Sequence, residues 1–256
     1  MNLNEIAQKL RHAFLNATPI GQFSEIYPDF TDKQAMEVQN IGLEMALGSG
    51  DKLVGYKMGL TSKAKQRDVN VFEPIRGYLL SSFELQKGST LSLSNRIHPR
   101  VEPEVAVIFK QRLQGPGLSL RDVVGAIDAI YPALEIVDSR FDNFKFKLSD
   151  VLADNTSAAG FMLGRTNLLS EINQLSLMGV IVRKNGRIVE TGAPAAVLGD
   201  PLLSVLSLAN SLGAEGKAIE PGQVILTGGI TNSVSFVSGD RLEIAWPQEL
   251  LTFQAL

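Results

Sequence analysis

The sequence predicts an α+β fold in which a helical N-terminal extension, residues 1–50, precedes a body of short strands, residues 51–256. Three observations support this prediction. Apolar residues recur at helical spacing before residue 50, β-rich runs separated by turns begin at Lys52, and only two later segments have a helical pattern. Apolar residues make up 45% of the 256-residue chain, which is enough to bury a large core.

Two helices are predicted in the extension. Apolar residues in Leu3–Phe14 form one stripe, and Asn2 precedes them as an N-cap. A second helix is predicted to begin at Thr31, because Gln34 follows three residues later as in a capping box. The glycines in residues 48–50 predict its end, since glycine adopts the left-handed C-cap conformation without steric cost.

The body is predicted to contain strands wherever a short β-rich run is bounded by turn residues. Asn185-Gly186 separates two such runs and predicts a hairpin, because a type I′ turn needs positive φ at both central positions. The predicted strands are Lys52–Met58, Val101–Phe109, Ala133–Val137, Val180–Arg183, Arg187–Glu190, Gln223–Thr227 and Arg241–Ala245.

Two further helices are predicted within the body. One begins near Ser119 and ends before Pro132, and it would bury Val123, Val124, Ile127 and Ile130. The other begins at Asp200-Pro201, an N-cap followed by proline at the first helical position. Its apolar stripe consists of Leu202, Val205, Leu206, Ala209 and Leu212.

Composition excludes several classes of function. The chain has 24 basic and 27 acidic residues, a net charge of −3, and this balance is unsuited to binding a nucleic-acid backbone. The absence of cysteine and the presence of only two histidines exclude disulfides, thiol nucleophiles and multi-histidine metal cages. No apolar run is long enough to cross a membrane, and the first 15 residues lack the apolar core of a signal peptide. We therefore expect a cytoplasmic protein without a membrane or nucleic-acid partner.

Paired glutamates are the strongest local signal. Glu102 and Glu104 lie in the predicted strand Val101–Phe109, where alternate side chains share a face and lie about 7 Å apart along the strand. Two such carboxylates repel each other unless a cation lies between them, and oxygen ligands suit magnesium, manganese or calcium. The alternative is a solvated face on an edge strand, which would also tolerate Pro103.

A third glutamate, Glu135, lies in the apolar run Ala133–Val137, where it is costly to ionise unless it is paired or binds a metal. With the first two glutamates it would form a three-carboxylate site for a divalent ion. Open positions would remain for water or substrate, as magnesium prefers. The alternative is a buried ion pair with Arg140 or Lys57.

Three other segments carry polar residues of the types found in active sites. Lys57 lies between apolar residues and glycines, so it either reaches solvent from a strand end or is held inside a site. Residues 154–157 (Asp-Asn-Thr-Ser) follow the strand-like Asp150–Ala153 and are equally typical of a turn or cap. Residues 227–231 (Thr-Gly-Gly-Ile-Thr) follow a buried strand, and their glycines would let N–H groups approach an anion, although an ordinary turn explains them too.

A recognisable combination is formed by Gly55–Ser62, His98–Val105, Pro132–Arg140, Ala153–Asn155 and Leu226–Thr231. Together these segments resemble the 2-keto-4-pentenoate hydratase and 4-oxalocrotonate decarboxylase group of the fumarylacetoacetate hydrolase superfamily. The resemblance covers nearly the whole chain, and the three glutamates are its most specific feature. It implies a mixed β-sheet rolled into a sandwich-like barrel, and it identifies residues 51–256 as a catalytic domain of this type.

The resemblance also implies roles for individual residues. Glu102, Glu104 and Glu135 would bind Mg²⁺ or Mn²⁺, and Lys57 and Ser157 would be catalytic residues. The substrate, a small 2-oxo dicarboxylic acid, would contact Leu60, Ile75, Asp154, Asn155, Thr227 and Gly228. A homo-oligomer is also expected, as is association with a partner hydratase or decarboxylase of the same pathway.

Position 75 favours decarboxylation over hydration. Hydratase-like members carry a Pro-Asp-aromatic-Gly stretch whose aspartate is thought to assist water addition, whereas residues 74–77 here are Pro-Ile-Arg-Gly. Decarboxylase-like members have isoleucine there and an Asp-Ser-Arg-aromatic-x-Asn-Phe-x-Phe stretch, which residues 138–146 match. Two departures from the family pattern are Arg76, in place of an aromatic residue, and Asp200, in place of a histidine.

The implied reaction is the metal-dependent decarboxylation of 2-oxohex-3-enedioate (4-oxalocrotonate) to 2-hydroxypenta-2,4-dienoate, in the meta-cleavage degradation of catechol. The 2-oxo acid would chelate the metal, which would stabilise the charge that develops on the keto oxygen. Two alternatives stay open. The first is a hydratase that adds water to 2-hydroxypentadienoate to give 4-hydroxy-2-oxopentanoate, and the second is a catalytically silent binding subunit.

Overall fold

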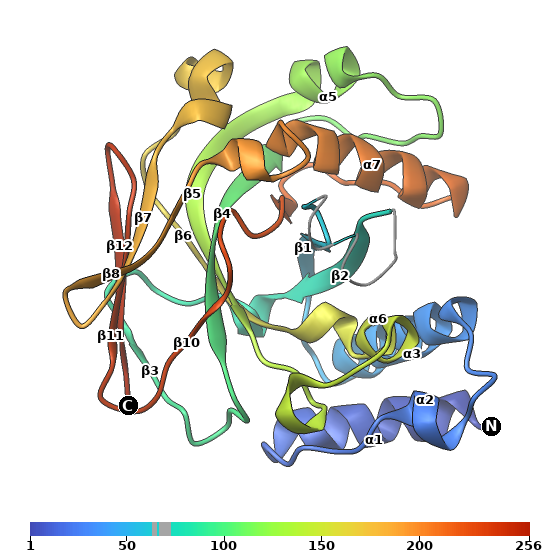
Figure 1. Ribbon diagram of the computed structural model, residues 1–256. Helices are drawn as coiled ribbons and strands as arrows, with labels where there is room; N and C mark the ends of the chain where they lie inside the picture. The colour runs from blue at the N-terminus through green and yellow to red at the C-terminus, as the bar shows by residue number, and fades with distance from the viewer. Residues whose placement is uncertain (63–65, 67–72) are drawn as a thin grey trace.

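The computed structural model describes residues 1–62, 66 and 73–256, and the strands of this part of the chain form two sheets (Figure 1). The strands are β1 (Leu53–Gly59), β2 (Ile75–Leu80), β3 (Thr90–Leu91), β4 (Arg100–Phe109), β5 (Ile127–Val137), β6 (Ala158–Leu163), β7 (Val180–Lys184), β8 (Arg187–Gly192), β9 (Val224–Leu226), β10 (Val234–Ser235), β11 (Arg241–Ala245) and β12 (Leu250–Ala255). The larger sheet has the order β2-β1-β9-β4-β5-β6, with β10 also paired to β4, and the smaller one has the order β3-β12-β11-β7-β8. Both sheets are mixed, because β1 pairs with β9 and β12 with β3 in parallel.

The two long N-terminal helices pack against the face of the larger sheet that is turned away from the smaller one, whereas the helices of residues 120–126 and 201–214 contribute to the main core (Figure 1). The α-helices are α1 (Leu3–Leu15), α2 (Phe23–Ile26), α3 (Asp32–Gly48), α5 (Leu120–Ala126), α6 (Leu148–Ala153) and α7 (Pro201–Ala214). Two short 3₁₀ turns lie near the site described below, η2 (Asp142–Phe144) and η3 (Asn155–Ser157). Among the described residues, no helix has the length and apolar character that a membrane span requires.

The main core fills the space between the two sheets. From the larger sheet, β4 contributes Val101, Val105, Val107 and Phe109. Strands of the smaller sheet contribute residues such as Val182, Ile244 and Phe253. The opposite face of β4 carries Glu102, Glu104, Ala106 and Ile108, and the last two pack in a separate cluster that includes Ala46 of α3. The predicted alternation along this strand and the sandwich of mixed sheets are both confirmed.

Strand β4 lies inside the larger sheet, so the edge-strand alternative for the paired glutamates is wrong. Pro103 is tolerated there because its carbonyl accepts a hydrogen bond from Ile230 N–H, in the loop between β9 and β10. Neighbouring residues of a strand direct their N–H and C=O groups to opposite sides. The missing N–H of Pro103 therefore faces this loop and removes no hydrogen bond from the β4–β5 ladder.

The two predicted N-terminal helices are confirmed. The Asn2 side chain accepts hydrogen bonds at the start of α1, and Thr31 and Gln34 form a reciprocal capping box at the start of α3. Both helices share a buried cluster with residues from the body, including Phe141, Leu152 and Ala153. The boundary at residue 50 stays a prediction.

Two local predictions were wrong. The segment from Ser119 forms only the short helix α5, and residues 127–137 continue as strand β5, with Ile127 and Ile130 in the sheet and Val124 exposed. Most residues of β5 are apolar and buried, so they do not alternate with polar residues as a half-buried strand would, and Val123, Val124, Ile127 and Ile130 also match helical spacing. Asp150–Ala153 is helical rather than strand-like, because it belongs to α6.

The other predicted strands and the helix from Asp200 are present. Asn185 and Gly186 both have positive φ, as the type I′ hairpin requires. Sequence patterns did not indicate β2, β6 or β12, nor the short β3 and β10. Of these, β2 matters most for function, because it places Ile75 beside the site.

Candidate functional site

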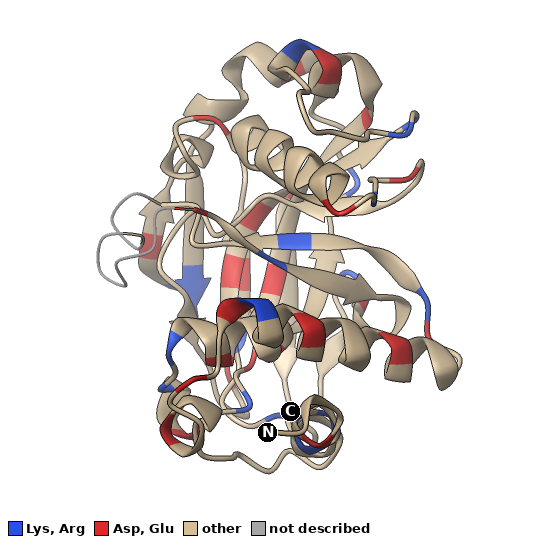
Figure 2. Cartoon of the chain, turned by 90° about the vertical axis from the view of Figure 1, so that its right-hand side faces the viewer, with Lys and Arg blue, Asp and Glu red and all other residues tan. Residues whose placement is uncertain are grey.

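The three predicted glutamates meet on the helix-covered face of the larger sheet. Glu102 and Glu104 share this face of β4, and Glu135 of β5 lies directly opposite Glu102 in the antiparallel register. One carboxylate oxygen from each glutamate lies within 4.8 Å of the other two. Figure 2 shows acidic positions side by side on neighbouring strands in the middle of the sheet.

Burial makes this cluster electrostatically unusual. Glu104 and Glu135 are fully buried, and Glu102 is partly exposed. Burial and the charge of Glu135 raise the pKa of Glu104 well above its usual value. Burial also raises the pKa of Glu135 to about 7, against the opposing effect of Lys57. The ionised cluster is therefore costly unless additional positive charge is present.

Lys57 is the one cation in direct contact with the cluster among the described residues. It lies on β1, and its Nζ is 3.1 Å from Glu135 Oε2 and 3.1 Å from the Thr156 carbonyl. Burial lowers the pKa of Lys57, but the three glutamates raise it by more, so its pKa lies above the usual value. Of the two pairings expected as alternatives for Glu135, the one with Lys57 is observed, whereas Arg140 pairs with Asp154.

The residues present suit a divalent cation. Among the described residues, the three carboxylates outnumber the one ammonium group that contacts them, and a divalent ion would supply further positive charge. In the described part of the chain, Glu104 Oε1 and Glu135 Oε1 are buried and receive no hydrogen bond. Buried oxygens without a donor are rare in folded proteins, and oxygen ligands of this kind suit a hard divalent cation.

The glycine-rich segment of residues 227–231 packs against these carboxylates. Gly228 N–H donates to Glu104 Oε2 at 2.7 Å, so the anion that this backbone approaches is a side chain of the cluster. Gly228 has a φ of +117°, and a Cβ there would lie 2.0 Å from Thr61 Oγ1. A Cβ on Gly229 would lie 2.8 Å from Glu102 Oε2. Glycine is required at both positions, because Gly228 lies against Thr61 and Gly229 lies against the Glu102 carboxylate.

A cavity of about 500 Å³ opens above the cluster. Five predicted site residues line it, namely Lys57, Leu60, Ile75, Glu102 and Ser157. Leu60 has a positive φ of 52°, a conformation that L-residues adopt rarely and that often marks functional loops. Ile75 provides an apolar wall, as its position in the sequence motif led us to expect.

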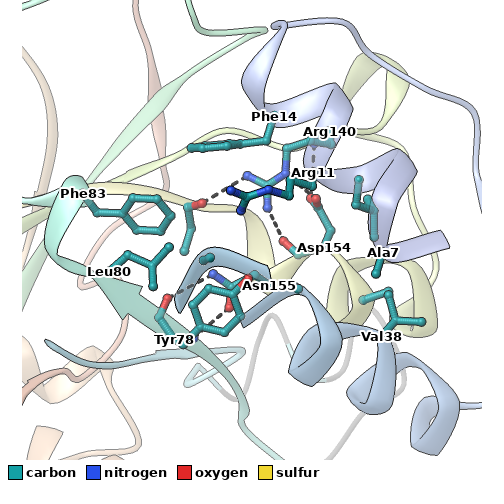
Figure 3. Close-up of a pocket in the computed structure, with 15 residues that line it drawn as sticks. Ala7, Arg11, Phe14, Val38, Tyr78, Leu80, Phe83, Arg140, Asp154 and Asn155 are labelled. Atoms are coloured by element: carbon teal, nitrogen blue, oxygen red, sulfur yellow. Dashed lines mark hydrogen bonds and ion pairs between the residues drawn. The ribbon is translucent and has the colours of Figure 1, made fainter. Parts of the chain in front are cut away.

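Four other predicted residues support the site without lining this cavity. Asp154 and Asn155 line a separate cavity of about 70 Å³ under α1 and α3 (Figure 3). Asp154 pairs with Arg140, and Asn155 holds β2 by accepting from Tyr78 N–H and donating to the Tyr78 carbonyl. Thr227 is buried and donates through Oγ1 to the Val105 carbonyl, and Gly228 contacts Glu104 as described.

The cavity is also lined by residues that sequence reasoning missed, notably Arg100, Val137, Phe144, Phe146 and Lys147. Arg100 was detectable, because it lies two residues before Glu102 and alternation places it on the same face of β4. The two phenylalanines and Lys147 follow β5 in an irregular segment whose path no local pattern predicts.

Neither departure from the family pattern enters the cavity. The guanidinium of Arg76 donates to Ser211 and pairs with Glu215, so it ties β2 to the C-terminal part of α7. Asp200 accepts from Leu202 N–H as the N-cap of α7. Both residues therefore act on the scaffold around the site.

The comparisons with known proteins agree with this geometry. The chain is 41% identical to a 4-oxalocrotonate decarboxylase of Pseudomonas putida over 94% of this chain and 91% of the relative. It is 34% identical to a 2-keto-4-pentenoate hydratase of Paraburkholderia xenovorans over 93% of this chain and 89% of the relative. No family model matches the chain.

Solved structures show the same relationship. The structure of the 4-oxalocrotonate decarboxylase from Pseudomonas putida G7, complexed with magnesium and adipate, has a TM-score of 0.96 and 39% identity, with 99% of this chain and 97% of that chain covered. A fumarylacetoacetate hydrolase family protein from Yersinia pestis shares the fold, with a TM-score of 0.58 at 16% identity over 78% of this chain and 92% of that one. The chain therefore belongs to the 4-oxalocrotonate decarboxylase and 2-keto-4-pentenoate hydratase family of lyases, which has the fumarylacetoacetate hydrolase fold.

Proposed function

We propose that this protein decarboxylates 2-oxohex-3-enedioate to 2-hydroxypenta-2,4-dienoate with Mg²⁺ or Mn²⁺ as cofactor, in the degradation of catechol by meta-cleavage. The observation that carries the proposal is the cluster of three carboxylates and Lys57 beneath a cavity with an apolar wall at Ile75. Two decarboxylase relatives support it, because they are 41% and 40% identical to this chain, whereas a third decarboxylase and the hydratases are 34–36% identical.

Glu102, Glu104 and Glu135 would hold the metal. When bound, it would act as a Lewis acid toward a 2-oxo acid and stabilise negative charge on the keto oxygen. Gly228 N–H and Lys57 hold Glu104 and Glu135 in place, so the ligand set is oriented before any ion enters.

Lys57 and Ser157 would act on the substrate itself. Both residues line the cavity, and the ammonium group of Lys57 is fixed by Glu135 and the Thr156 carbonyl. From this position Lys57 would stabilise an enolate oxygen or deliver a proton to it. The Ser157 hydroxyl donates to Asp154 Oδ2 at 3.4 Å in this structure, and it would turn from this long contact to donate a hydrogen bond to a substrate carboxylate.

The apolar wall would promote loss of CO2. Ile75 and Leu60 line part of the cavity with hydrocarbon side chains, which offer water no hydrogen bond. Removing hydration from a departing carboxylate favours neutral CO2. Asp154, Asn155, Thr227 and Gly228 would define the shape of this wall and of the metal site through the contacts described above.

Hydration is the second candidate function. Its support is the 34% identity to a 2-keto-4-pentenoate hydratase, which shows that closely similar sequences carry that name. Against it stands Ile75, since a hydrocarbon side chain cannot activate water. A catalytically silent binding subunit is disfavoured, because all three glutamates and Lys57 are present and assembled.

A direct comparison of substrates tests the proposal. Purified protein with Mg²⁺ is supplied with 2-oxohex-3-enedioate and, separately, with 2-hydroxypenta-2,4-dienoate, and CO2 release and water addition are followed. We expect CO2 release to be much the faster. Faster hydration would assign the hydratase function and leave the metal site intact, whereas no turnover of either compound would favour the silent subunit.

We also propose that the protein forms a homo-oligomer and associates with a partner hydratase of the same pathway. Ile188 and Val189 lie on the edge strand β8 and are 54% and 43% exposed. An apolar sheet edge of this kind favours contact with another chain. Light scattering after size-exclusion chromatography measures the oligomer, and co-elution with the hydratase tests the association.

A further inference from the structure

Arg100 occupies a distinctive position relative to the carboxylate cluster. It lies on the same face of β4 as Glu102 and Glu104, and two residues along a strand correspond to about 7 Å. Its register partner on β5 is Val137, which comes two residues after Glu135. Arg100 and Val137 therefore form the next pair of the β4–β5 ladder beyond Glu102 and Glu135. Both residues line the large cavity.

The guanidinium of Arg100 is held in place without an anionic partner. It stacks over Phe144, with Cζ 4.1 Å from the ring centroid, and Phe144 in turn contacts His98. Within the described ranges, no carboxylate forms an ion pair with it. Lys57, by contrast, is neutralised by Glu135. Arg100 thus places on the cavity wall a positive charge that no carboxylate contacts among the described residues, and Phe144 fixes its position.

We infer that Arg100 binds the carboxylate at the end of the substrate distant from the metal and selects 2-oxo dicarboxylic acids over 2-oxo acids with an apolar end. This inference rests on the proposed function, since the carboxylate cluster must anchor the 2-oxo end. A guanidinium presents two parallel N–H donors to a carboxylate, and stacking on an aromatic ring orients it in advance. A short dicarboxylic acid anchored at the cluster and extended along β4 would point its far end toward Arg100.

The chemistry predicts where this interaction acts. In decarboxylation the bond between C5 and C6 breaks, its electron pair moves into the conjugated 2-oxo system, and the far carboxylate leaves as neutral CO2. The enolate oxygen then takes up a proton to give the hydroxydienoate. The ion pair with Arg100 is thus strongest in the bound substrate and opposes the loss of charge from the carboxylate, so it acts against the effect of the apolar wall at Ile75 and serves binding rather than the chemical step. It should lower KM without raising kcat.

Two inhibitors of equal chain length test the inference without turnover. 2-Oxoadipate and 2-oxohexanoate share the 2-oxo acid end and differ in whether the far end is a carboxylate or a methyl group. Dissociation constants are measured by calorimetry on the Mg²⁺-loaded protein. We expect 2-oxoadipate to bind the unaltered protein about 10- to 100-fold more tightly, the range that charge-assisted hydrogen bonds provide. Equal affinities would overturn the inference.

Variants identify the residue responsible. Arg100→Met should remove the preference for 2-oxoadipate while leaving 2-oxohexanoate affinity unchanged, and Arg100→Lys should keep part of it. Arg187→Met, an exposed position on β8, is the matched control and should keep the whole preference. If Lys147→Gln rather than Arg100→Met removes the preference, the assignment is wrong. If Arg100→Met does not fold, retention of the full preference by Arg100→Lys would equally contradict bidentate binding.

The kinetic readout separates this inference from the proposed function. With 2-oxohex-3-enedioate, Arg100→Met should raise KM about 10- to 100-fold and change kcat by less than KM. If the unaltered protein binds neither 2-oxo acid, the proposed function fails. If it binds both and decarboxylates the enedioate, but Arg100→Met changes neither preference nor KM, only the role of Arg100 is refuted.

Discussion

Replacing Lys57 by methionine removes the ammonium group and keeps a flexible chain of similar volume. In the structure this group is 3.1 Å from Glu135 Oε2, and the two side chains are 4% and 0% exposed. The substitution should therefore have two separable effects. It should destabilise the metal-free protein, because Glu135 loses the one counter-ion that it has among the described residues, and it should lower turnover of the metal-loaded enzyme.

The distance gives the size of the first effect. At an effective dielectric constant of about 20, opposite unit charges 3.1 Å apart attract each other by about 5 kcal/mol. Measured costs of breaking a buried pair are about 3–5 kcal/mol. Glu135, with a pKa of about 7, can become neutral by taking up a proton, so we expect a loss near the lower limit, about 3 kcal/mol. For turnover we expect a fall of roughly 10²- to 10⁴-fold, the usual effect of a proton-transfer or charge-stabilising group.

Urea unfolding with and without Mg²⁺ measures the first effect, and steady-state kinetics at saturating Mg²⁺ measure the second. Mg²⁺ should restore part of the lost stability, because the ion replaces the missing positive charge, and the affinity for Mg²⁺ should not fall. Lys52→Met, at the exposed approach to β1, is the control and should match the unaltered protein in both assays. Activity of Lys57→Met within a few-fold of the unaltered protein would show that Lys57 is only a structural counter-ion, and the catalytic reasoning would be refuted.

Three further predictions concern the carboxylate cluster, the buried glutamate Glu249 and the apolar wall at Ile75. Glu104→Gln should keep the fold, because an amide oxygen can still accept from Gly228 N–H. It should weaken Mg²⁺ binding at least 10-fold, as calorimetry would measure. Unchanged affinity would show that Glu104 is not a metal ligand. Glu249 is buried, which raises its pKa, but Lys87 and two backbone N–H groups lower it by more, so its pKa in the folded state lies below 4.5. Its charge therefore stabilises the fold above about pH 4.5 and loses this effect as the pH falls below that value. Glu249→Gln should lower the free energy of unfolding by about 1–3 kcal/mol at pH 7, as urea unfolding would measure. A difference in stability that persists undiminished at pH 3 would contradict this pH dependence. Ile75→Asp should slow CO2 release and speed water addition to 2-hydroxypenta-2,4-dienoate, with both rates measured on one preparation; an unchanged ratio of rates would show that position 75 does not select the reaction.

Sequence patterns located the carboxylate cluster because its signal is local. Alternation in a strand places Glu102 and Glu104 on one face whatever the strand pairs with, and a glutamate in an apolar run such as that around Glu135 needs compensation in any fold. Helix ends were equally predictable, since the caps at Asn2 and Thr31 depend on side chains within three residues of the backbone groups they satisfy.

Other features depend on which strands become neighbours. The distance between Glu102 and Glu135 follows from the β4–β5 register, and Lys57 reaches Glu135 because β1 and β9 pair beside β4. The apolar residues of 127–131 matched helical spacing, but this segment is strand because it pairs with β4, and pairing with a distant strand is not visible in local periodicity.

By itself, the sequence determined the family, the α+β class, the three glutamates and the apolar residue at position 75. Each of these is a matter of residue type at a short spacing, and residue type sets charge, capping and strand alternation directly. Only the tertiary structure decided that Arg100 and Phe144 line the large cavity, whereas Asp154 and Asn155 line a separate, smaller one. Long-range packing sets the path of an irregular segment and decides which residues line a cavity. No local sequence pattern encodes that packing.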